Sequence, residues 1–503
     1  MKKDADGTIL IPQPSDDPDD PLNWSDARKN ITLSIWAFAC FSSQISAMTN
    51  LQGSFLQAPV YHKTPVQVNY NISLTLAGLI IGPMLVVPLG RRFGLCCCLL
   101  WSTVGVLATA IWSALMTGEK DYGAFLASRF VAGVFAGCPL ILGSAMVVQV
   151  FFRHHRGRCL HILHIPYLLG VITAPIFGGY IISTQSWTVQ FWWTAGMNGL
   201  LILLILCFLE DSESSVAAKE SLLHRRLRTY TGRAVATPAS WRDCTRMVRN
   251  EFRIGFSPLG MLAGFFLLVD FGFSTMTLVM VNLFLADPVD EGGYGFTSTE
   301  IASFTFCLWI GVCIAELYGH FVSDRLPLWL SRRQSGIWRP EFRLHCLWAP
   351  ASLVPVGVGL FGASLEYHLH WAVLALASML TFIGSMSIVP HTTAYLTDCF
   401  PDLVAEMSAI MGLYRLIFGL TTTFFITPWA AAVGVGWVFG TAAFISLAAL
   451  GIVGILVSWG ELFRRQLGDF TETAPETELF VAGADGDGQS QQVQREFLVS
   501  NTP

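Results

Sequence analysis

Apolar residues along this chain gather in about twelve long runs, separated by shorter segments that carry most of the charged side chains. Each run is close to or above the roughly 20 residues that an α-helix needs to cross the apolar core of a bilayer. The pattern therefore predicts an all-α membrane protein whose helices span residues 31–49, 68–88, 96–116, 123–150, 160–183, 190–209, 257–285, 301–322, 344–363, 371–396, 406–428 and 435–459.

Positive charge is distributed on one side of these segments. If the chain is threaded from a cytosolic N-terminus, only Lys63 and Lys120 of its 30 Lys and Arg fall outside, and only Arg129 and Arg415 fall within spans. Cytosolic loops collect Lys and Arg because basic segments resist translocation. We expect a multi-pass protein of the plasma membrane with both termini in the cytosol. Membrane orientation explains the basic loops, so we expect no nucleic-acid partner.

The composition supports a lipid-embedded chain. Of the 503 residues, 53% are hydrophobic and only 13% are charged, whereas soluble domains carry about 25% charged residues. The acidic, polar N-terminus has no signal-peptide pattern, so the first span would direct insertion. The acidic segments 1–30 and 461–503 are predicted to be disordered tails.

Cysteine usage and catalytic motifs exclude several classes of function. None of the twelve Cys lies in a predicted outer loop, and no Cys/His metal spacing occurs. The run Cys96-Cys97-Cys98 at a membrane edge is either a palmitoylation site or a set of small helix residues. The chain has no phosphate-binding Walker loop, no GxSxG and no HExxH. We therefore expect no catalytic residues, metal or cofactor, no enzyme activity, and an ion gradient as the energy source.

The basic segment 210–255 divides the twelve spans into two sets of six, which predicts helix bundles over 31–209 and 256–460. Part of this linker is expected to form an amphipathic helix on the inner leaflet. The segments 88–94 and 319–325 carry arginines at equivalent positions of the two halves. Such repeats are common in secondary transporters, whose substrate site lies between the halves near the bilayer midplane.

Several motifs resemble those of the major facilitator superfamily, in particular its fungal drug:proton antiporter branch. The segment 17–24 reads DPDDPLNW, span 4 carries Arg129-x-x-x-Gly133-x-x-x-Gly137, and the segments 319–344 and 398–406 match the style of that branch. Span 5 carries the likeness of the antiporter motif at Gly170, Ala174, Pro175, Gly178 and Gly179. The resemblance covers nearly the whole chain and implies two six-helix bundles that expose a shared site alternately to each side.

Span 4 places Arg129, Gly133 and Gly137 on one helix face, where the glycines would let a neighbouring helix approach closely. A charge inside a span costs roughly 2.5–3.5 kcal/mol on insertion scales, so Arg129 needs a polar cavity or a partner. The resemblance assigns it to proton coupling, and the alternative is a structural Arg bound to backbone carbonyls. In span 5, Pro175 would bend the helix. The resemblance gives that motif a role against proton leak in exporters, and the alternative is close packing alone.

Charged residues at the predicted cytosolic edge are candidates for a gate. Arg91 and Arg92 follow span 2, and acids near Asp398 or Glu406 are their candidate partners. Simple membrane anchoring explains the two arginines equally well. In the second half, Asp324 and Arg325 form the corresponding acid–base pair.

The remaining polar groups within the spans suggest a transport path, because ionisable residues inside a bilayer mark such paths or pair with one another. Asp270 and Arg415 have opposite charge and comparable depth. Asp270 is therefore either a second-half proton or cation site or half of a static pair. Arg129, Asp270 and Arg415 are the candidates for proton coupling. The candidates for the wall of a substrate cavity are Gln44, Tyr167, Asn198, Glu316 and Tyr395.

These observations predict a secondary active transporter of a small organic molecule, which acts as a monomer in the bilayer with protons as the coupling ion. The resemblance favours efflux of a drug-like compound or secondary metabolite. The alternatives are proton-driven uptake of a cationic nutrient, such as a polyamine, and a membrane sensor that transports nothing.

Overall fold

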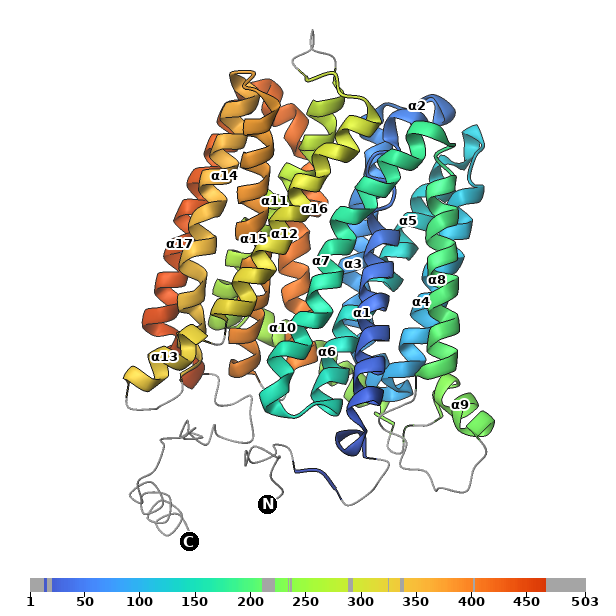
Figure 1. Cartoon of the computed structure of the whole chain (residues 1–503), viewed down its shortest axis with the longest axis vertical. Coiled ribbons are helices and arrows are strands. Elements are labelled where there is room, and N and C mark those ends of the chain that lie inside the picture. The colour runs from blue at the N-terminus through green and yellow to red at the C-terminus, as the bar shows by residue number, and fades with distance from the viewer. Residues whose placement is uncertain are drawn as a thin grey trace.

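The computed structural model describes residues 13–15, 20–209, 222–233, 235, 238–287, 293–323, 325–334, 339–400 and 403–466. Within these residues it contains twelve helical segments that are long and apolar enough to cross a membrane. They form an elongated bundle in which the helices run nearly side by side (Figure 1). The twelve predicted spans are thus confirmed, each within several residues of its expected position.

The first half of the chain contains six of these segments. Its helices are α1 (Asp26–Met48), the short α2 (Ser54–Tyr61), α3 (Pro65–Phe93), α4 (Leu95–Leu115), α5 (Tyr122–Ala136), α6 (Cys138–Val150), α7 (Arg153–Thr184) and α8 (Val189–Phe208). The single span expected over 123–150 is divided into α5 and α6 around Gly137 and Pro139, since proline supplies no backbone N–H for the preceding turn.

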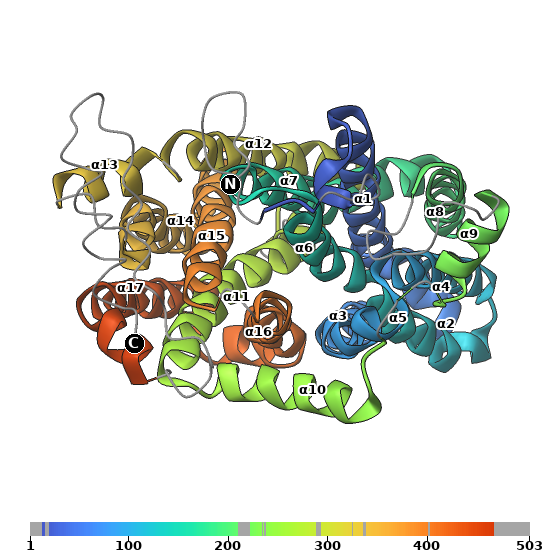
Figure 2. The same cartoon turned by 90° about the horizontal axis from the view of Figure 1, so that it is seen from below.

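The second half repeats this arrangement. Its spanning helices are α11 (Pro258–Ala286), α12 (Ser298–Val322), α14 (Trp348–Glu366), α15 (Trp371–Cys399), α16 (Val404–Val433) and α17 (Val435–Gln466). The short α13 (Arg325–Arg333) and the 3₁₀-helix η4 (Pro340–Leu347) connect α12 to α14. Viewed along the helices, the two sets lie beside each other, and α3, α7, α11, α12 and α16 are near the boundary (Figure 2).

The linker between the halves contains α9 (Leu222–Tyr230) and α10 (Trp241–Gly255). Figure 2 shows α10 crossing below both α3 and α16, and it packs against both helices. The expected amphipathic helix is confirmed, but its buried face, which includes Cys244, Glu251 and Ile254, rests on protein. We call the end of the bundle that carries α9, α10 and α13 the basic end, and the end that carries α2 the opposite end.

Two predicted boundaries were wrong. The first helix begins at Asp26, five residues before the expected bundle, because Ser25 accepts a hydrogen bond from the backbone of Arg28 and caps it. The last helix extends to Gln466, into the segment expected to be a tail. The rest of the two tail predictions concerns residues outside the described ranges, apart from 13–15 and 20–25. There, Asp20 caps the 3₁₀-helix η1 (Pro21–Asn23).

Candidate functional site

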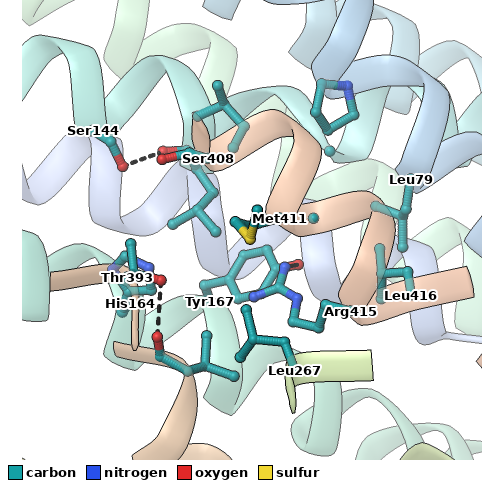
Figure 3. Close-up of a pocket in the computed structure, with 16 residues that line it drawn as sticks. Leu79, Ser144, His164, Tyr167, Leu267, Thr393, Ser408, Met411, Arg415 and Leu416 are labelled. Atoms are coloured by element: carbon teal, nitrogen blue, oxygen red, sulfur yellow. Dashed lines mark hydrogen bonds between the residues drawn. The ribbon is translucent and has the colours of Figure 1, made fainter. Parts of the chain in front are cut away.

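A pocket lies between the two halves (Figure 3). It contains about 600 Å³ of empty space, including its open mouth. Helices α3, α6 and α7 of the first half and α11, α15 and α16 of the second half contribute its wall. The lining residues are Leu79, Pro83, Gly137, Leu140, Ile141, Ser144, His164, Tyr167, Leu267, Val389, Thr393, Ser408, Met411, Gly412, Arg415 and Leu416.

The pocket lies in the half of the bundle nearer the basic end. Helices α7 and α16 both start at that end, and the lining residues His164 and Ser408 lie about three turns and about one turn from those starts. At the opposite end, polar contacts join the halves. The Gln52 amide donates to the Asn282 side chain at 3.3 Å, and the hydroxyls of Tyr180 and Ser303 lie 2.9 Å apart. The halves are therefore tied together on the far side of the pocket.

Arg415 and Tyr167 meet in the pocket wall from opposite halves. The Arg415 guanidinium donates a hydrogen bond to the Tyr167 hydroxyl at 2.9 Å. It also lies over the rings of Tyr167 and Phe271, at 5.3 Å and 5.2 Å from their centroids. The Arg415 residue is only 8% exposed, and its Nε has no hydrogen-bond acceptor among the residues that the structure describes. Tyr167 was predicted to line a cavity and Arg415 to couple protons, and both line this pocket.

Asp270 lies one turn beyond the lining residue Leu267 on α11 and is 1% exposed. Among the residues that the structure describes, neither of its carboxylate oxygens has a hydrogen-bond partner. The static pair of Asp270 with Arg415, one of the two alternatives for Asp270, is therefore not formed in this conformation, because Arg415 is held by Tyr167 and the two rings. An isolated charge is costly to bury, so an ionised carboxylate at this depth would need a partner.

Arg129 is buried away from this pocket. It donates hydrogen bonds to the backbone carbonyls of Ser46 and Ala47 in the last turn of α1, and it lies over the ring of Phe191. A cation is favourable at a helix C-terminus, where carbonyls lack partners within the helix. These contacts match the alternative of a structural Arg bound to backbone carbonyls. The coupling role of Arg129 stays a prediction.

The glycines of span 4 allow α3 and α5 to touch through their backbones. A Cβ on Gly133 of α5 would lie 2.1 Å from the Thr75 carbonyl oxygen of α3, and one on Gly82 of α3 would lie 1.9 Å from the Val134 carbonyl oxygen of α5. Both distances are far below van der Waals contact, so a side chain at either glycine would force the helices apart. The predicted close approach of a neighbouring helix is confirmed.

The motif in α7 faces two different neighbours. A Cβ on Gly170 would lie 2.7 Å from the Phe41 carbonyl of α1, within the first half. A Cβ on Gly179 would lie 2.8 Å from Ala302 of α12, in the second half. Ala174, Pro175 and Gly178 belong to the same helix, and Ala174 is buried. Close packing explains the small residues, and a role against proton leak stays a prediction.

Charged residues at the basic end form mostly contacts within one half. Asp398 accepts a hydrogen bond from Arg343 at 2.7 Å, so it is held inside the second half. Arg92 donates to the Ala239 carbonyl at 2.7 Å. The proposed link between Asp398 and the arginines of α3 was therefore wrong. Arg91 lies near enough to Glu406 for electrostatic attraction, which keeps the second candidate link open.

The remaining gate residues add little. Arg325 lies over the ring of Phe321, 5.6 Å from its centroid, on its own side of the boundary. Asp324 falls outside the described residues. A carboxylate that no sequence pattern singles out is Glu251 of α10. It is fully buried, and neither of its oxygens has a hydrogen-bond partner among the described residues. Burial, and the nearby negative charge of Glu406, raise the pKa of Glu251 to about 8.

Four predicted cavity residues lie outside this pocket. Asn198 bonds to Ser42 and Ser46 in the packing of α8 on α1. Gln44 is buried on α1, and Glu316 lies on α12. Tyr395 is buried on α15, with its hydroxyl close to Gly460 of α17. The pocket instead uses small polar groups that hydropathy does not distinguish from packing residues: Ser144, Thr393 and Ser408.

Comparison with known proteins agrees with this architecture. A family model described as Major Facilitator Superfamily matches residues 30–425, and the chain belongs to that superfamily. It is 25% identical over 458 residues to the MFS transporter cpaT of Aspergillus oryzae, covering 89% of this chain and 90% of that one. It is 24% identical over 483 residues to the efflux pump radE of Floropilus chiversii, covering 92% and 86%.

Among solved structures, the chain resembles the proton:xylose symporter XylE of E. coli bound to 6-bromo-6-deoxy-D-glucose. The TM-score is 0.63 at 13% identity, covering 86% of this chain and 97% of that one. This likeness shows the fold. The protein is thus a multi-pass membrane transporter of the superfamily, and its relatives and fold are those of transporters of small molecules.

Proposed function

We propose that this protein exports a small organic molecule across the plasma membrane in exchange for protons, by alternating access. The observation that carries this proposal is the pocket between the halves, whose wall is shared by six helices, three from each half. A site built in this way is opened and closed when one half moves against the other. The positive-inside rule supports a cytosolic basic end, and hence cytosolic termini, with the pocket nearer the cytosol.

Proton exchange is supported by Asp270. It is buried, unpaired and one turn from the pocket, so it is well placed to bind a proton when water reaches it and to release it on the other side. The outward direction is supported by relatives such as the efflux pump radE. Uptake of a cationic nutrient is less well supported, because none of the sixteen residues drawn around the pocket is Asp or Glu.

The test measures retention of fluorescent probes in a yeast host that lacks its own efflux pumps. The probes are fluorescein, rhodamine 6G and Nile red, which differ in charge, so the test does not depend on the charge of the cargo. Export predicts lower retention of at least one probe in expressing cells, and a protonophore should remove the difference. Higher retention would indicate uptake, and equal retention of all three probes would contradict transport of such molecules.

Asp270→Asn separates coupling from folding. The variant should reach the plasma membrane in normal amounts, and its protonophore-sensitive export should be lost. The matched control is Glu119→Gln, which removes a carboxylate that is exposed at the opposite end; it should export like the wild type. Full activity of Asp270→Asn would remove Asp270 from the coupling mechanism.

A further inference from the structure

The charge of the pocket differs from the charge of the whole chain. The protein has a formal net charge of −5, yet the one permanently charged side chain among the sixteen residues described around the pocket is the cation Arg415. His164 adds an imidazole, and Ser144, Thr393 and Ser408 add hydroxyls. A cationic cargo would find no counter-charge in this wall, whereas an anionic cargo would find one.

The Arg415 guanidinium also has N–H groups available to donate hydrogen bonds to a further partner. A guanidinium has five N–H donors. One hydrogen bond goes to the Tyr167 hydroxyl at 2.9 Å. Within the described part of the chain the Nε has no acceptor, although the residue is only 8% exposed. A buried donor without an acceptor costs free energy, which a bound carboxylate, sulfonate or phenolate would recover through charge-assisted hydrogen bonds.

The rest of the wall fits an apolar body attached to such an acidic group. Leu79, Leu267 and Met411 surround the space next to Arg415, and the Tyr167 ring forms one side (Figure 3). Ile141 also lines the pocket. Aromatic and aliphatic side chains of this kind bind flat ring systems by area burial, while a few polar groups fix their orientation.

We propose that the pocket takes an amphipathic organic anion, an apolar ring system with one acidic group, and that Arg415 binds the acidic group. This proposal rests on the proposed transport function and specifies its cargo. Binding of the anion would compete for the guanidinium with Tyr167, which belongs to the other half. Cargo would in this way loosen a hydrogen bond that joins the two halves.

The test compares two probes with the same ring system. 1-Anilinonaphthalene-8-sulfonate carries a sulfonate, and N-phenyl-1-naphthylamine is the same molecule without it. Binding of each is measured on the full chain in nanodiscs, with empty nanodiscs subtracted. We expect the wild type to bind the sulfonate about tenfold or more tightly than the neutral amine, the gain of a charge-assisted hydrogen bond. Equal or weaker binding of the sulfonate by the wild type would overturn the proposal, and this measurement does not depend on any variant.

Variants then test whether the preference for the sulfonate over the neutral amine depends on Arg415. Arg415→Gln should remove the preference for the sulfonate and leave binding of the neutral amine unchanged, and Arg415→Lys should retain part of it. Tyr167→Phe keeps the ring and frees one N–H, so it should keep the full preference. The control Arg246→Gln removes an exposed arginine of α10 and should have no effect. A preference for the sulfonate that survives in Arg415→Gln would also overturn the proposal.

The two proposals fail in different ways. If the sulfonate binds through Arg415 but no probe is exported from cells, the proposed function fails and the ligand class stands. If export of rhodamine 6G or Nile red depends on Asp270 but the nanodisc experiment shows no preference for the sulfonate, the proposed ligand class fails and the proposed export stands.

Discussion

The two arginines inside the spans show how differently the halves treat a buried cation. Arg129 is 1% exposed and bonds to two backbone carbonyls of its own half. Arg415 is 8% exposed and bonds to a tyrosine of the other half, in the wall of a pocket. The same residue type in the same setting is thus fixed inside one half in the first case and shared across the boundary between the halves in the second. In the alternating-access mechanism proposed above, only the shared contact would change.

The strongest test of the rigid side of this comparison is Gly82→Ala, because α3 packs there against α5, which carries Arg129. The new Cβ would lie 1.9 Å from the Val134 carbonyl, and overpacking of this kind costs about 3 kcal/mol. We expect a clear drop in the midpoint of unfolding in detergent. Gly196→Ala is the control, since a Cβ there has nothing within 4 Å. Equal stability of both variants would show that α3 and α5 are not tightly locked.

The direct comparison is Arg129→Met against Arg415→Met. Arg129→Met leaves the carbonyls of Ser46 and Ala47 without their side-chain donor, which should cost about 2 kcal/mol of the free energy of unfolding. Arg415→Met removes one bond to a hydroxyl and should cost less than about 1 kcal/mol while it reduces binding of the anionic probe. Unfolding midpoints and probe binding, measured on both variants, check this. The reverse order of stabilities would exchange the roles assigned to the two arginines.

A pH experiment extends the comparison to a buried anion, Glu251 of α10. Its pKa is raised to about 8, so the packed state of α10 holds a proton that the released helix would lose above its ordinary pKa of 4.5. The packed state is therefore favoured at low pH and is weakened as the pH rises toward 8, by at most about tenfold in the packing equilibrium per pH unit. Above pH 8 the effect levels off.

Cys244 reports this equilibrium, since it is buried on α10 with its Sγ 3.7 Å from the Pro88 carbonyl. The ratio of its thiol-labelling rates in the wild type and in Glu251→Gln cancels the intrinsic pH dependence of the reagent. This ratio should rise between pH 5 and 8. A ratio that stays flat, or falls, would show that Glu251 does not bind a proton in the packed state. Of the charged groups on the helices packed against α10, Glu406 of α16 lies near Glu251, and Arg91 of α3 lies near Glu406. Arg92 of α3 lies over the Trp241 ring at the start of α10, and Asp270 of α11 is several turns away.

The smallest expected effect comes from Tyr167→Phe. It removes one hydrogen bond across the boundary and keeps the ring under the guanidinium, so the free energy of unfolding should change by about 1 kcal/mol or less. Export should continue, with a modest change in rate because the halves separate more easily. Loss of the folded protein would show that the Tyr167–Arg415 contact is structural, as the Arg129 contacts are.

The number and position of the spans could be predicted from the sequence because a hydrocarbon environment imposes a length and a polarity on every helix. The glycine contacts of α5 were predictable for a similar reason, since Arg129, Gly133 and Gly137 share one face. The boundaries at Asp26 and Gln466 were missed because a polar helix turn outside the membrane has no hydropathy signal. Local capping by Ser25 decides the first of them.

The pocket was predictable only in part. Tyr167 and Arg415 stood out as a polar aromatic and a charge within apolar runs. Ser144, Thr393 and Ser408 did not, because small hydroxyls in a span usually bond to the carbonyl one turn earlier, as Ser144 and Thr393 also do here. The side-chain partners of Asp398 and Arg415 could not be predicted. Asp398 binds Arg343 and Arg415 binds Tyr167, and each choice depends on helix rotation, which composition does not fix.

The position of α10 has a pharmacological consequence. Because this helix rests on α3 and α16 at once and is attached to α3 through Arg92 and the Ala239 carbonyl, a molecule wedged beneath it would obstruct the relative motion of the halves without entering the cargo pocket. Such an inhibitor would be non-competitive. Raising the concentration of the transported compound would not displace it.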